Sequence, residues 1–291
     1  MRLAGWLGKA SGLWELTKPR ALVVIIFTSC LGFILAEPDQ VRWLRMTMLG
    51  FGVGLAGAGS LALNQYFERH KDALMERTRQ RPLPSGRVSA LSAFLFGWLL
   101  MGAGYAYLWL WVNPYSSLVT VLCGVSYLAW YTPLKYKTSL SSFVGAIPGA
   151  VLPVMGWVAS RDQMELGAWI LFGILFIWQI PHALIIAIRY REDYARAGMK
   201  QLPVVANDFV GTRQILLNLI ILIPLSVMPS LTDMAGFYYG TYALATGFSL
   251  LVLGIRYAFR PSEGRARAFF IALSVYLPLL LLVMVLDKPG I

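Results

Sequence analysis

Long apolar segments alternate with short polar loops along almost the whole chain. A helix that crosses a bilayer needs about 17–25 mostly apolar residues, and nine segments approach or reach this length. They are residues 21–36, 46–63, 88–111, 115–131, 139–159, 166–188, 214–231, 235–255 and 268–286. A backbone in lipid has to satisfy its own hydrogen bonds, so such segments form helices. The pattern predicts an all-α, polytopic membrane protein, a bundle of nine transmembrane helices in a single domain over residues 1–291.

The second and fifth segments carry small and helix-bending residues. Glycine recurs along the second segment at spacings of two to four, which lets neighbouring helix backbones approach closely. The fifth segment contains Pro148 and Pro153 beside Gly145 and Gly149. Because proline frees a backbone carbonyl one turn earlier, such a helix bends and its free carbonyl needs a polar neighbour. We expect the fifth helix to be kinked and to lie in the interior of the bundle.

The composition agrees with a lipid environment. The chain is 58% hydrophobic and 13% charged, with a mean hydropathy of +0.64, whereas about 25% of the residues of a soluble domain are charged. The two cysteines, Cys30 and Cys123, stand alone in apolar segments. This usage argues against a disulfide framework and against a metal or redox site built on a cysteine pair.

The net charge of +11 is explained by where the basic residues stand. Of the 25 Lys and Arg residues, 21 lie in the N-terminal segment or in every second loop. The other loops hold Arg42, Arg45, Arg161 and Lys288. Since cytoplasmic loops carry the excess of Lys and Arg, we expect the N-terminus to be cytoplasmic and the C-terminus to lie outside. The basic character thus reports topology in a lipid bilayer, and we expect no nucleic-acid partner.

The predicted cytoplasmic loop after the second segment contains a row of oxygen ligands. Asn64, Glu68 and Asp72 are four residues apart, so they share one face if the helix continues into the loop. Their oxygens suit Mg²⁺, which takes one or two carboxylates together with substrate phosphates. Arg77 and Arg81 follow, and guanidinium groups bind phosphate oxygens in pairs. The alternative is a solvated loop whose mixed charges pair with each other and with lipid headgroups.

A second polar constellation closes the sixth segment. Gln179 and His182 interrupt a long apolar stretch on one helix face, and polar side chains at membrane depth usually face a cavity. His182 has two open uses, a hydrogen-bonded structural role or a ligand to a metal-bearing cofactor. Asp193 adds an acid at the same membrane edge, and Lys135 lies in the loop between the two acidic sites. Acids and bases on one membrane side suit a magnesium-bridged diphosphate that leaves during a reaction.

At these residues the chain resembles the UbiA-type intramembrane prenyltransferase superfamily, and within it the branch that farnesylates haem. Asn64, Glu68 and Asp72 occupy the motif N-x-x-x-D-x-x-x-D, with Glu68 in place of an Asp. Ala197 stands where the second motif, D-x-x-x-D, often has an acid four residues after Asp193. Further similar stretches are Leu16 to Arg20, Met75 to Thr78, Arg81 to Leu83, Trp178 to His182 and Leu202 to Val204.

The resemblance implies a site, a cofactor and two substrates. It implies Mg²⁺ on Asn64, Glu68, Asp72 and Asp193, and the diphosphate of farnesyl diphosphate on Arg77, Arg81, Lys135 and Arg191. It implies that haem B, the acceptor, binds His182, Gln179 and Trp178, and that Tyr131 and Tyr190 position the substrates. The implied reaction transfers a farnesyl group to a haem vinyl group. Its product, haem O, would pass to a haem A synthase or to the assembly of a terminal oxidase.

Two other functions stay open on the sequence. A member of the same superfamily could prenylate a quinone precursor or a chlorophyll-type acceptor, but such acceptors offer no iron to His182. A transporter could use a kinked helix and polar residues in mid-span, but it needs no diphosphate and no magnesium. The first twenty residues lack the pattern of a secretory signal or of an Arg- and Ser-rich leader. We therefore expect a bacterial cell inner membrane, with the active site on the cytoplasmic side.

Overall fold

The computed structural model describes residues 10–37, 40–206 and 208–289, and the chain in these ranges is helical, without a strand. Residues 10–16 form a short first helix. The long helices are α2 (Pro19–Ala36), α3 (Trp43–Asp72), α4 (Ala90–Trp111), α5 (Pro114–Val125), α7 (Ser141–Arg161), α8 (Leu166–Arg189), α11 (Asp208–Leu231), α12 (Phe237–Phe259) and α13 (Glu263–Leu286). Short elements connect them: the π-helix η1 (Ser126–Tyr131), α6 (Thr132–Leu134), α9 (Arg191–Arg196) and α10 (Leu202–Val205).

Within the described ranges, nine segments are long and apolar enough to cross a membrane, which confirms the expected number. The fourth, Pro114–Leu134, runs through α5, η1 and α6. The second extends well beyond its apolar part, because α3 continues past residue 63 to Asp72. Arg69, His70 and Lys71 stand in its last turn, where positive charge stabilises the negative end of the helix dipole.

Local signals fix where several helices begin. The side-chain oxygen of Asn113 accepts a hydrogen bond from the Ser116 N–H at 2.6 Å, and Pro114 occupies the first position of α5. Ser89 and Ser262 cap α4 and α13 in the same way, each through its hydroxyl oxygen. These caps lie in the short loops, so the polar residues between the apolar segments also define the helix ends.

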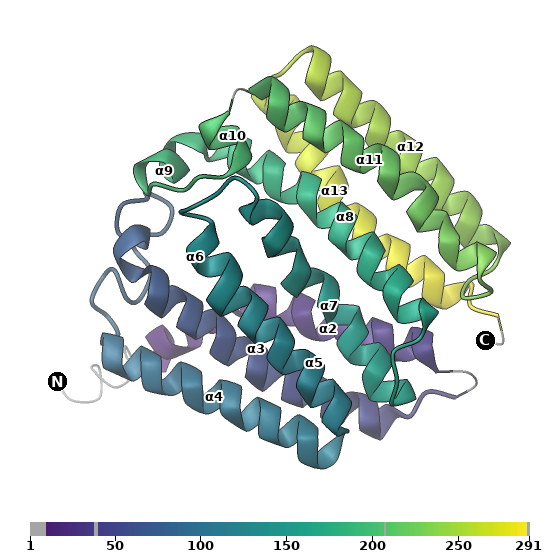
Figure 1. Cartoon of the computed structure of the whole chain (residues 1–291), viewed down its shortest axis with the longest axis horizontal. Coiled ribbons are helices and arrows are strands. Elements are labelled where there is room, and N and C mark those ends of the chain that lie inside the picture. Colours follow the sequence, from purple (N-terminus) through teal and green to yellow (C-terminus); the bar gives the residue numbers. More distant parts are fainter. Residues whose placement is uncertain (1–9, 38–39, 207, 290–291) are drawn as a thin grey trace.

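Helix α7 lies in the interior of the bundle, as its two prolines predict. It packs against α2, α5 and α8 (Figure 1), and 61% of its membrane span is buried, more than for any other span described. Glycine permits the close contact with α2, since a Cβ on Gly156 would lie 1.9 Å from the backbone oxygen of Ser29. Gly59 has the same role between α3 and α4, where a Cβ would lie 2.4 Å from the Met101 nitrogen. The expected close packing of the second segment is thus confirmed.

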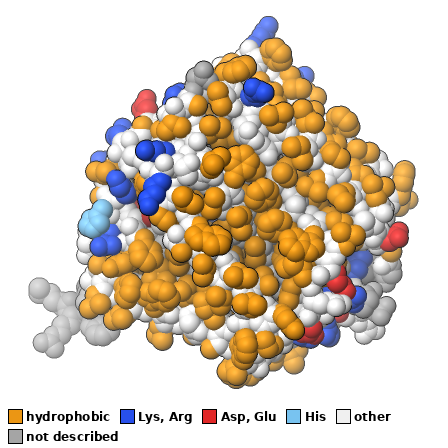
Figure 2. Space-filling model, in the orientation of Figure 1, with side chains coloured by type: hydrophobic (Ala, Val, Ile, Leu, Met, Phe, Trp, Pro, Cys, Tyr) orange, Lys and Arg blue, Asp and Glu red, His pale blue; other side chains and the backbone are white. Residues whose placement is uncertain are grey.

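The bundle has an apolar side and two polar ends. Figure 2 shows hydrophobic side chains over most of the visible face and Lys and Arg side chains gathered mainly toward its upper left. We call the end formed by residues 73–89, 135–140 and 190–206 the site end. The end formed by the α2–α3, α4–α5 and α7–α8 connections is the far end (Figure 1). The assignment of the site end to the cytoplasm stays a prediction from the Lys and Arg distribution.

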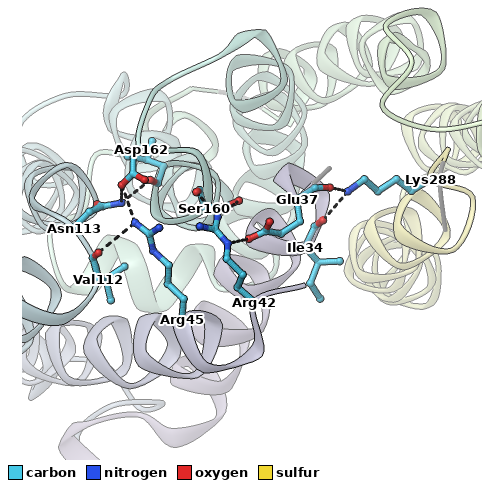
Figure 3. A network of polar contacts seen from close by, with 10 residues as sticks. Ile34, Glu37, Arg42, Arg45, Val112, Asn113, Ser160, Asp162 and Lys288 are labelled. Carbon is cyan, nitrogen blue, oxygen red and sulfur yellow. Dashed lines mark hydrogen bonds and ion pairs between the residues drawn. The ribbon is translucent and has the colours of Figure 1, made fainter. Parts of the chain in front are cut away.

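A network of ion pairs and hydrogen bonds joins the helices at the far end (Figure 3). Its charged and amide side chains are Glu37, Arg42, Arg45, Asn113, Asp162 and Lys288. The Arg42 guanidinium contacts Glu37 at 2.8 Å and the backbone oxygen of Ser160 at 2.5 Å. Asp162 accepts hydrogen bonds from Arg45 and Asn113, each at 2.7 Å. The network therefore ties the α2–α3 loop and the start of α3 to the ends of α4 and α7.

Candidate active site

Helix α3 continues past its apolar part to Asp72, as the spacing of its polar residues required, and presents one column of polar side chains. Asn64, Glu68 and Asp72 are spaced by four residues on α3, so they share a face. All three are buried, with exposed fractions of 2%, 4% and 1%. Two carboxylates that are almost excluded from water need positive partners. The column is therefore a site built to hold cations.

Three cations surround this column. Lys135 forms an ion pair with Glu68, and Nη1 of Arg81 lies 2.7 Å from Oδ2 of Asp72. Nζ of Lys18 donates a hydrogen bond to the side-chain oxygen of Asn64 at 3.3 Å. The structure thus brings together five of the residues predicted for this site and adds Lys18.

Lys18 is the member of the site that the sequence did not single out. It lies directly before α2, in the left-handed backbone region with φ of 48°, which side chains rarely adopt without cause. Burial, followed by the positive charge of Arg81, lowers the pKa of Lys18 to about 7. In the sequence this lysine is one more basic residue at a membrane edge. Its position directly before Pro19, the first residue of α2, indicated only that it stands at a helix start.

A π-helix forms the next wall of the site. In η1 the rings of Tyr127 and Tyr131 stack, with centroids 5.9 Å apart. The Thr132 hydroxyl donates to the Tyr127 carbonyl at 2.8 Å and accepts from the Asn64 amide at 3.1 Å. The Lys135 ammonium lies 5.4 Å from the centre of the Tyr131 ring. Short π-helical segments often occur at functional sites, and this one links the acid column to the cavity beneath it.

A cavity of about 680 Å³ extends from Tyr131 into the bundle. Its wall takes one face each of α2, α3, α5, α7, α8 and α13, and it is mostly apolar. Val24 and Phe27 of α2 and Pro278 of α13 line the cavity although they are exposed on the outside of the bundle. The cavity therefore opens sideways, toward lipid, between α2 and α13. Its volume suits a ligand with an apolar body and a polar head.

The residues predicted to bind the acceptor lie in the α8 wall of this cavity. Trp178, Gln179 and His182 all line it, and the Trp178 ring stacks on the His182 ring at 4.9 Å. Trp178 donates to the Leu273 carbonyl at 2.9 Å, and Gln179 donates to the Gly145 carbonyl at 3.4 Å. Nδ1 of His182 is buried without a hydrogen-bond partner among the described residues. A purely structural histidine usually has that nitrogen hydrogen-bonded, so packing alone does not account for this imidazole in the cavity wall.

Asp193 is not brought into the α3 column. Its carboxylate accepts from the Glu76 N–H at 3.3 Å and pairs with Arg196. Burial alone would raise the pKa of Asp193, but the Arg196 contact and the backbone N–H groups of Glu76 and Arg77 outweigh it and lower the pKa. Asp193 thus anchors the segment that carries the site arginines.

The second acid of the family motif is replaced for a packing reason. Ala197 is 1% exposed and belongs to an apolar cluster with Met75, Tyr194 and Met199. A carboxylate at this position would be buried among apolar groups, which is costly without a partner. The cluster instead holds α9 against the loop that follows α3.

Three further predicted residues lie around the rim of the site. The Arg77 guanidinium stacks over the Tyr190 ring at 5.4 Å, and Tyr190 is 38% exposed. Arg191 donates to the Ala206 carbonyl at 3.2 Å, at the end of α10. Within the structure these three side chains stay outside the group formed by Lys18, Arg81 and Lys135.

The donor set of α3 fits a hard divalent cation. Oδ1 of Asp72 is buried and accepts no hydrogen bond from the described residues, so one carboxylate oxygen stays free for a cation. No group of three or more His, Cys, Asp and Glu side chains gathers in the described part of the chain. The column offers a cation two acids and one amide, which leaves further ligand positions open.

Comparison with known proteins places this chain in a family. The chain matches the UbiA prenyltransferase family over residues 25–276. A protoheme IX farnesyltransferase of Solibacter usitatus is 44% identical over 287 residues, which cover 95% of this chain and 98% of the relative. One of Myxococcus xanthus is 38% identical over 280 residues, which cover 96% and 95%.

Solved structures share the fold at lower identity. A structure described for digeranylgeranylglyceryl phosphate synthase superposes with a TM-score of 0.82 at 17% identity, over 97% of this chain and 99% of that one. A UbiA homolog of Archaeoglobus fulgidus bound to GPP and Mg²⁺ gives a TM-score of 0.66 at 15% identity, over 94% and 99%. At these identities the likeness concerns the arrangement of the helices.

Proposed function

The chain belongs to the UbiA prenyltransferase family, and from this premise we propose that it transfers a farnesyl group from farnesyl diphosphate to a vinyl group of haem B. Relatives that cover nearly the whole chain carry the name protoheme IX farnesyltransferase. The observation that carries the proposal is the cavity. It starts beside the acid column at Tyr131 and is lined by the imidazole of His182, whose buried Nδ1 has no hydrogen-bond partner in the described chain.

The acid column and its cations receive the diphosphate. Asn64, Glu68 and Asp72 would hold Mg²⁺, which supplies charge neutralisation on the leaving diphosphate. Lys135 and Arg81 now pair with Glu68 and Asp72. If a cation occupied these carboxylates, Arg81 and Lys135 would be free to bind phosphate oxygens beside Lys18. Cations fixed in this way stabilise the negative charge that develops as the diphosphate leaves.

The rim residues position this machinery. Asp193 holds the backbone of Glu76 and Arg77 and so orients the segment that ends at Arg81. Arg77 and Arg191 stand beside the entrance, where they contact Tyr190 and the end of α10. We assign them to the capture of the diphosphate from the aqueous side.

The reaction proceeds in the cavity beneath the column. The bond between C1 of the farnesyl group and the diphosphate oxygen breaks, and the electron pair leaves with the diphosphate. The terminal vinyl carbon of haem attacks C1, a water oxygen adds to the other vinyl carbon, and a proton is released. Tyr127 and Tyr131 line the cavity at this depth, and their ring faces favour the allylic cation.

The acceptor binds along α8. His182 offers its unpaired imidazole nitrogen to the haem iron, and Trp178 supports the imidazole by stacking. The lateral opening between α2 and α13 gives both apolar substrates a route from the bilayer. The excess of Lys and Arg at the site end supports a cytoplasmic location of the reaction.

The test is incubation of the purified protein with haem B, farnesyl diphosphate and Mg²⁺, followed by mass spectrometry of the extracted haem. We expect a haem that has gained one farnesyl and one hydroxyl group, and none when EDTA is present. The same sample without farnesyl diphosphate is the control for haem oxidation.

An unmodified haem from folded protein would overturn the haem assignment. Assays with hydroxybenzoate and quinone precursors then decide whether another acceptor is used. A product from one of them would keep the prenyl transfer and change only the acceptor.

A further inference from the structure

A strip of flat side chains runs along the wall between α8 and α13 and ends at an arginine. The His182 ring lies 4.9 Å from Trp178 and 5.2 Å from Phe270 of α13. The Arg189 guanidinium lies over the same Phe270 ring, at 5.7 Å. Trp178, His182 and Arg189 are four and then seven residues apart on α8, so they project from one helix face. One phenylalanine ring thus connects the cavity imidazole to a guanidinium at the site end.

The Arg189 side chain has no acidic partner in the described chain, unlike Arg81 and Lys135 of the acid column. It is half-buried, and no carboxylate of the described chain forms an ion pair with it. Arg81, Lys135 and Arg196 each pair with an acid. A half-buried guanidinium without a counter-ion favours an anionic group of a ligand, because that group replaces water that burial removes.

We propose that Arg189 binds a propionate of the haem acceptor and thereby fixes which edge of the porphyrin faces the prenyl chain. This assignment rests on the haem function proposed above. The seven residues from His182 to Arg189 rise about 10 Å along α8. This is comparable to the distance from the centre of a porphyrin to its carboxylates. An iron on His182 therefore brings a propionate to Arg189 at the membrane edge.

The orientation has a consequence for the chemistry. A protohaem carries its vinyl groups on the edge opposite its propionates, so the vinyl edge points down α8 toward Gln179. Gln179 packs on α7, where a Cβ on Gly149 would lie 2.0 Å from its side-chain oxygen. Tyr131, beside the acid column, packs on Gly145 one turn earlier. The reactive ends of the two substrates thus meet beside the same two turns of α7.

A lipid phosphate is the other anion that could reach Arg189 at the membrane edge. Both ligands are anions bound by a guanidinium, but only haem loses its anionic groups when its propionates are esterified. The assay therefore compares haem B with haem B dimethyl ester, in a neutral detergent without added anionic lipid. The kcat and KM for each acceptor are measured with saturating farnesyl diphosphate and Mg²⁺, and haem binding is followed by absorbance without farnesyl diphosphate.

Three variants separate the role of this charge from folding. Arg189→Gln removes the charge, and Arg189→Lys keeps it without the guanidinium fork. Arg256→Gln removes an exposed arginine near the site-end terminus of α12 and is the matched control. In the wild type we expect KM to be about tenfold lower for haem B than for the ester. In Arg189→Gln we expect haem B to lose its advantage, so that both acceptors have the same KM and the same dissociation constant, each raised above the wild-type values for haem B. The kcat should stay within about threefold of the wild-type value.

Arg189→Lys should keep part of the preference, and Arg256→Gln should behave as the wild type. An Arg189→Gln protein that still prefers haem B over the ester as the wild type does would overturn the assignment. So would a wild type that treats the two acceptors alike. If the wild type modifies no haem at all, the proposed function fails and the Arg189 assignment fails with it. If the wild type modifies haem and Arg189→Gln has the same acceptor preference as the wild type, the Arg189 assignment is refuted and the proposed function stands.

Discussion

The bundle carries a polar network at each end, and the two networks differ in how their charges are matched. At the far end, Glu37 pairs with Arg42, and Asp162 pairs with Arg45 and accepts a hydrogen bond from the Asn113 amide (Figure 3). Backbone carbonyls there accept from Arg42, Arg45 and Lys288. At the site end, Lys18, Arg81 and Lys135 surround only two acids, and one buried oxygen of Asp72 accepts no hydrogen bond from the described chain.

This difference indicates that the far end has a structural role and the site end a functional one. Charges that satisfy each other stabilise helix packing and leave nothing for a ligand. A buried carboxylate oxygen that accepts no hydrogen bond, such as Oδ1 of Asp72, is costly in the free protein. A protein can tolerate this free-energy cost at a functional site, because a bound ligand with a metal and a phosphate would pair the buried groups. The four predictions that follow test this contrast, in order of decreasing expected effect.

Replacement of Asp72 by Asn should have the largest effect. It removes a buried carboxylate that pairs with Arg81 and, under the proposed function, holds the metal. We expect prenyl transfer to fall by at least about 100-fold, with the protein still folded in detergent. The measurement is product formation per folded protein.

The matching change at the far end is Asp162→Asn, which breaks the contact with Arg45. This variant should keep prenyl transfer close to the wild-type rate. Equal losses of activity in Asp72→Asn and Asp162→Asn would contradict the assignment of a functional role to the site end and a structural role to the far end.

Removal of the Lys18 charge should weaken the binding of the prenyl diphosphate. Lys18→Gln leaves the hydrogen bond to Asn64 possible but removes one of three cations around the acids. A charge-assisted hydrogen bond contributes about 1.5–3 kcal/mol, so we expect the KM for farnesyl diphosphate to rise at least about tenfold. Arg20→Gln, which removes an exposed charge two residues later, is the control. An unchanged KM in Lys18→Gln would remove this lysine from the site.

Disruption of the far-end network should lower stability and spare the chemistry. Glu37 is 5% exposed and its partner Arg42 is about half-exposed, so Glu37→Gln breaks a partly buried ion pair. We expect a loss of about 2 kcal/mol in the free energy of unfolding, seen as a lower thermal midpoint in detergent. Glu15→Gln, which breaks the exposed pair with Arg87 at 2.7 Å, should change stability by less than about 1 kcal/mol. A larger loss in Glu15→Gln than in Glu37→Gln would contradict this ranking.

The smallest effect is a pH dependence at the far end. A hydrogen bond from Arg161, assisted by one from Trp157, lowers the pKa of Glu165 in the folded protein. The ionised form is thus favoured on folding. Its stabilisation is complete above the unfolded pKa of about 4.3 and is lost as the pH falls through the lower, folded value.

We expect at most about 1 kcal/mol from this group, because it is partly exposed. Thermal unfolding between pH 3 and 6 measures it, with Glu165→Gln as the comparison. If the variant loses stability with falling pH as steeply as the wild type, Glu165 is not the group responsible.

Much of the fold was accessible from the sequence because lipid imposes a simple rule on it. Apolar length predicts a span, and the nine expected segments all form helices. Glycine content predicted close packing of α3 against a neighbouring helix, and the glycines and prolines of the fifth segment predicted the interior position of α7. The sequence could not place the end of α3, since the charged residues after residue 63 are also typical of a loop.

The residues of the candidate site also separate into those that the sequence predicted and those that it could not. The i, i+4 spacing of Asn64, Glu68 and Asp72 placed them on one face because they belong to one helix. Lys18 and the π-helix η1 were not predicted, since a lysine before a span and a tyrosine-rich helix end have common structural explanations. The separation of Asp193 from the column could not be predicted either, because it depends on how α9 packs against the loop after α3.

The sequence by itself determined the number of spans and the shared face of Gln179 and His182, and it put Asn64, Glu68 and Asp72 on one face wherever α3 continues as a helix. All of these follow from periodicity within one helix, where geometry is fixed by local hydrogen bonds. The tertiary structure alone decided that Lys18, Arg81 and Lys135 meet around that column. It also decided that Arg189 shares the Phe270 ring with His182. These contacts join residues from different helices, and packing between helices sets their distances.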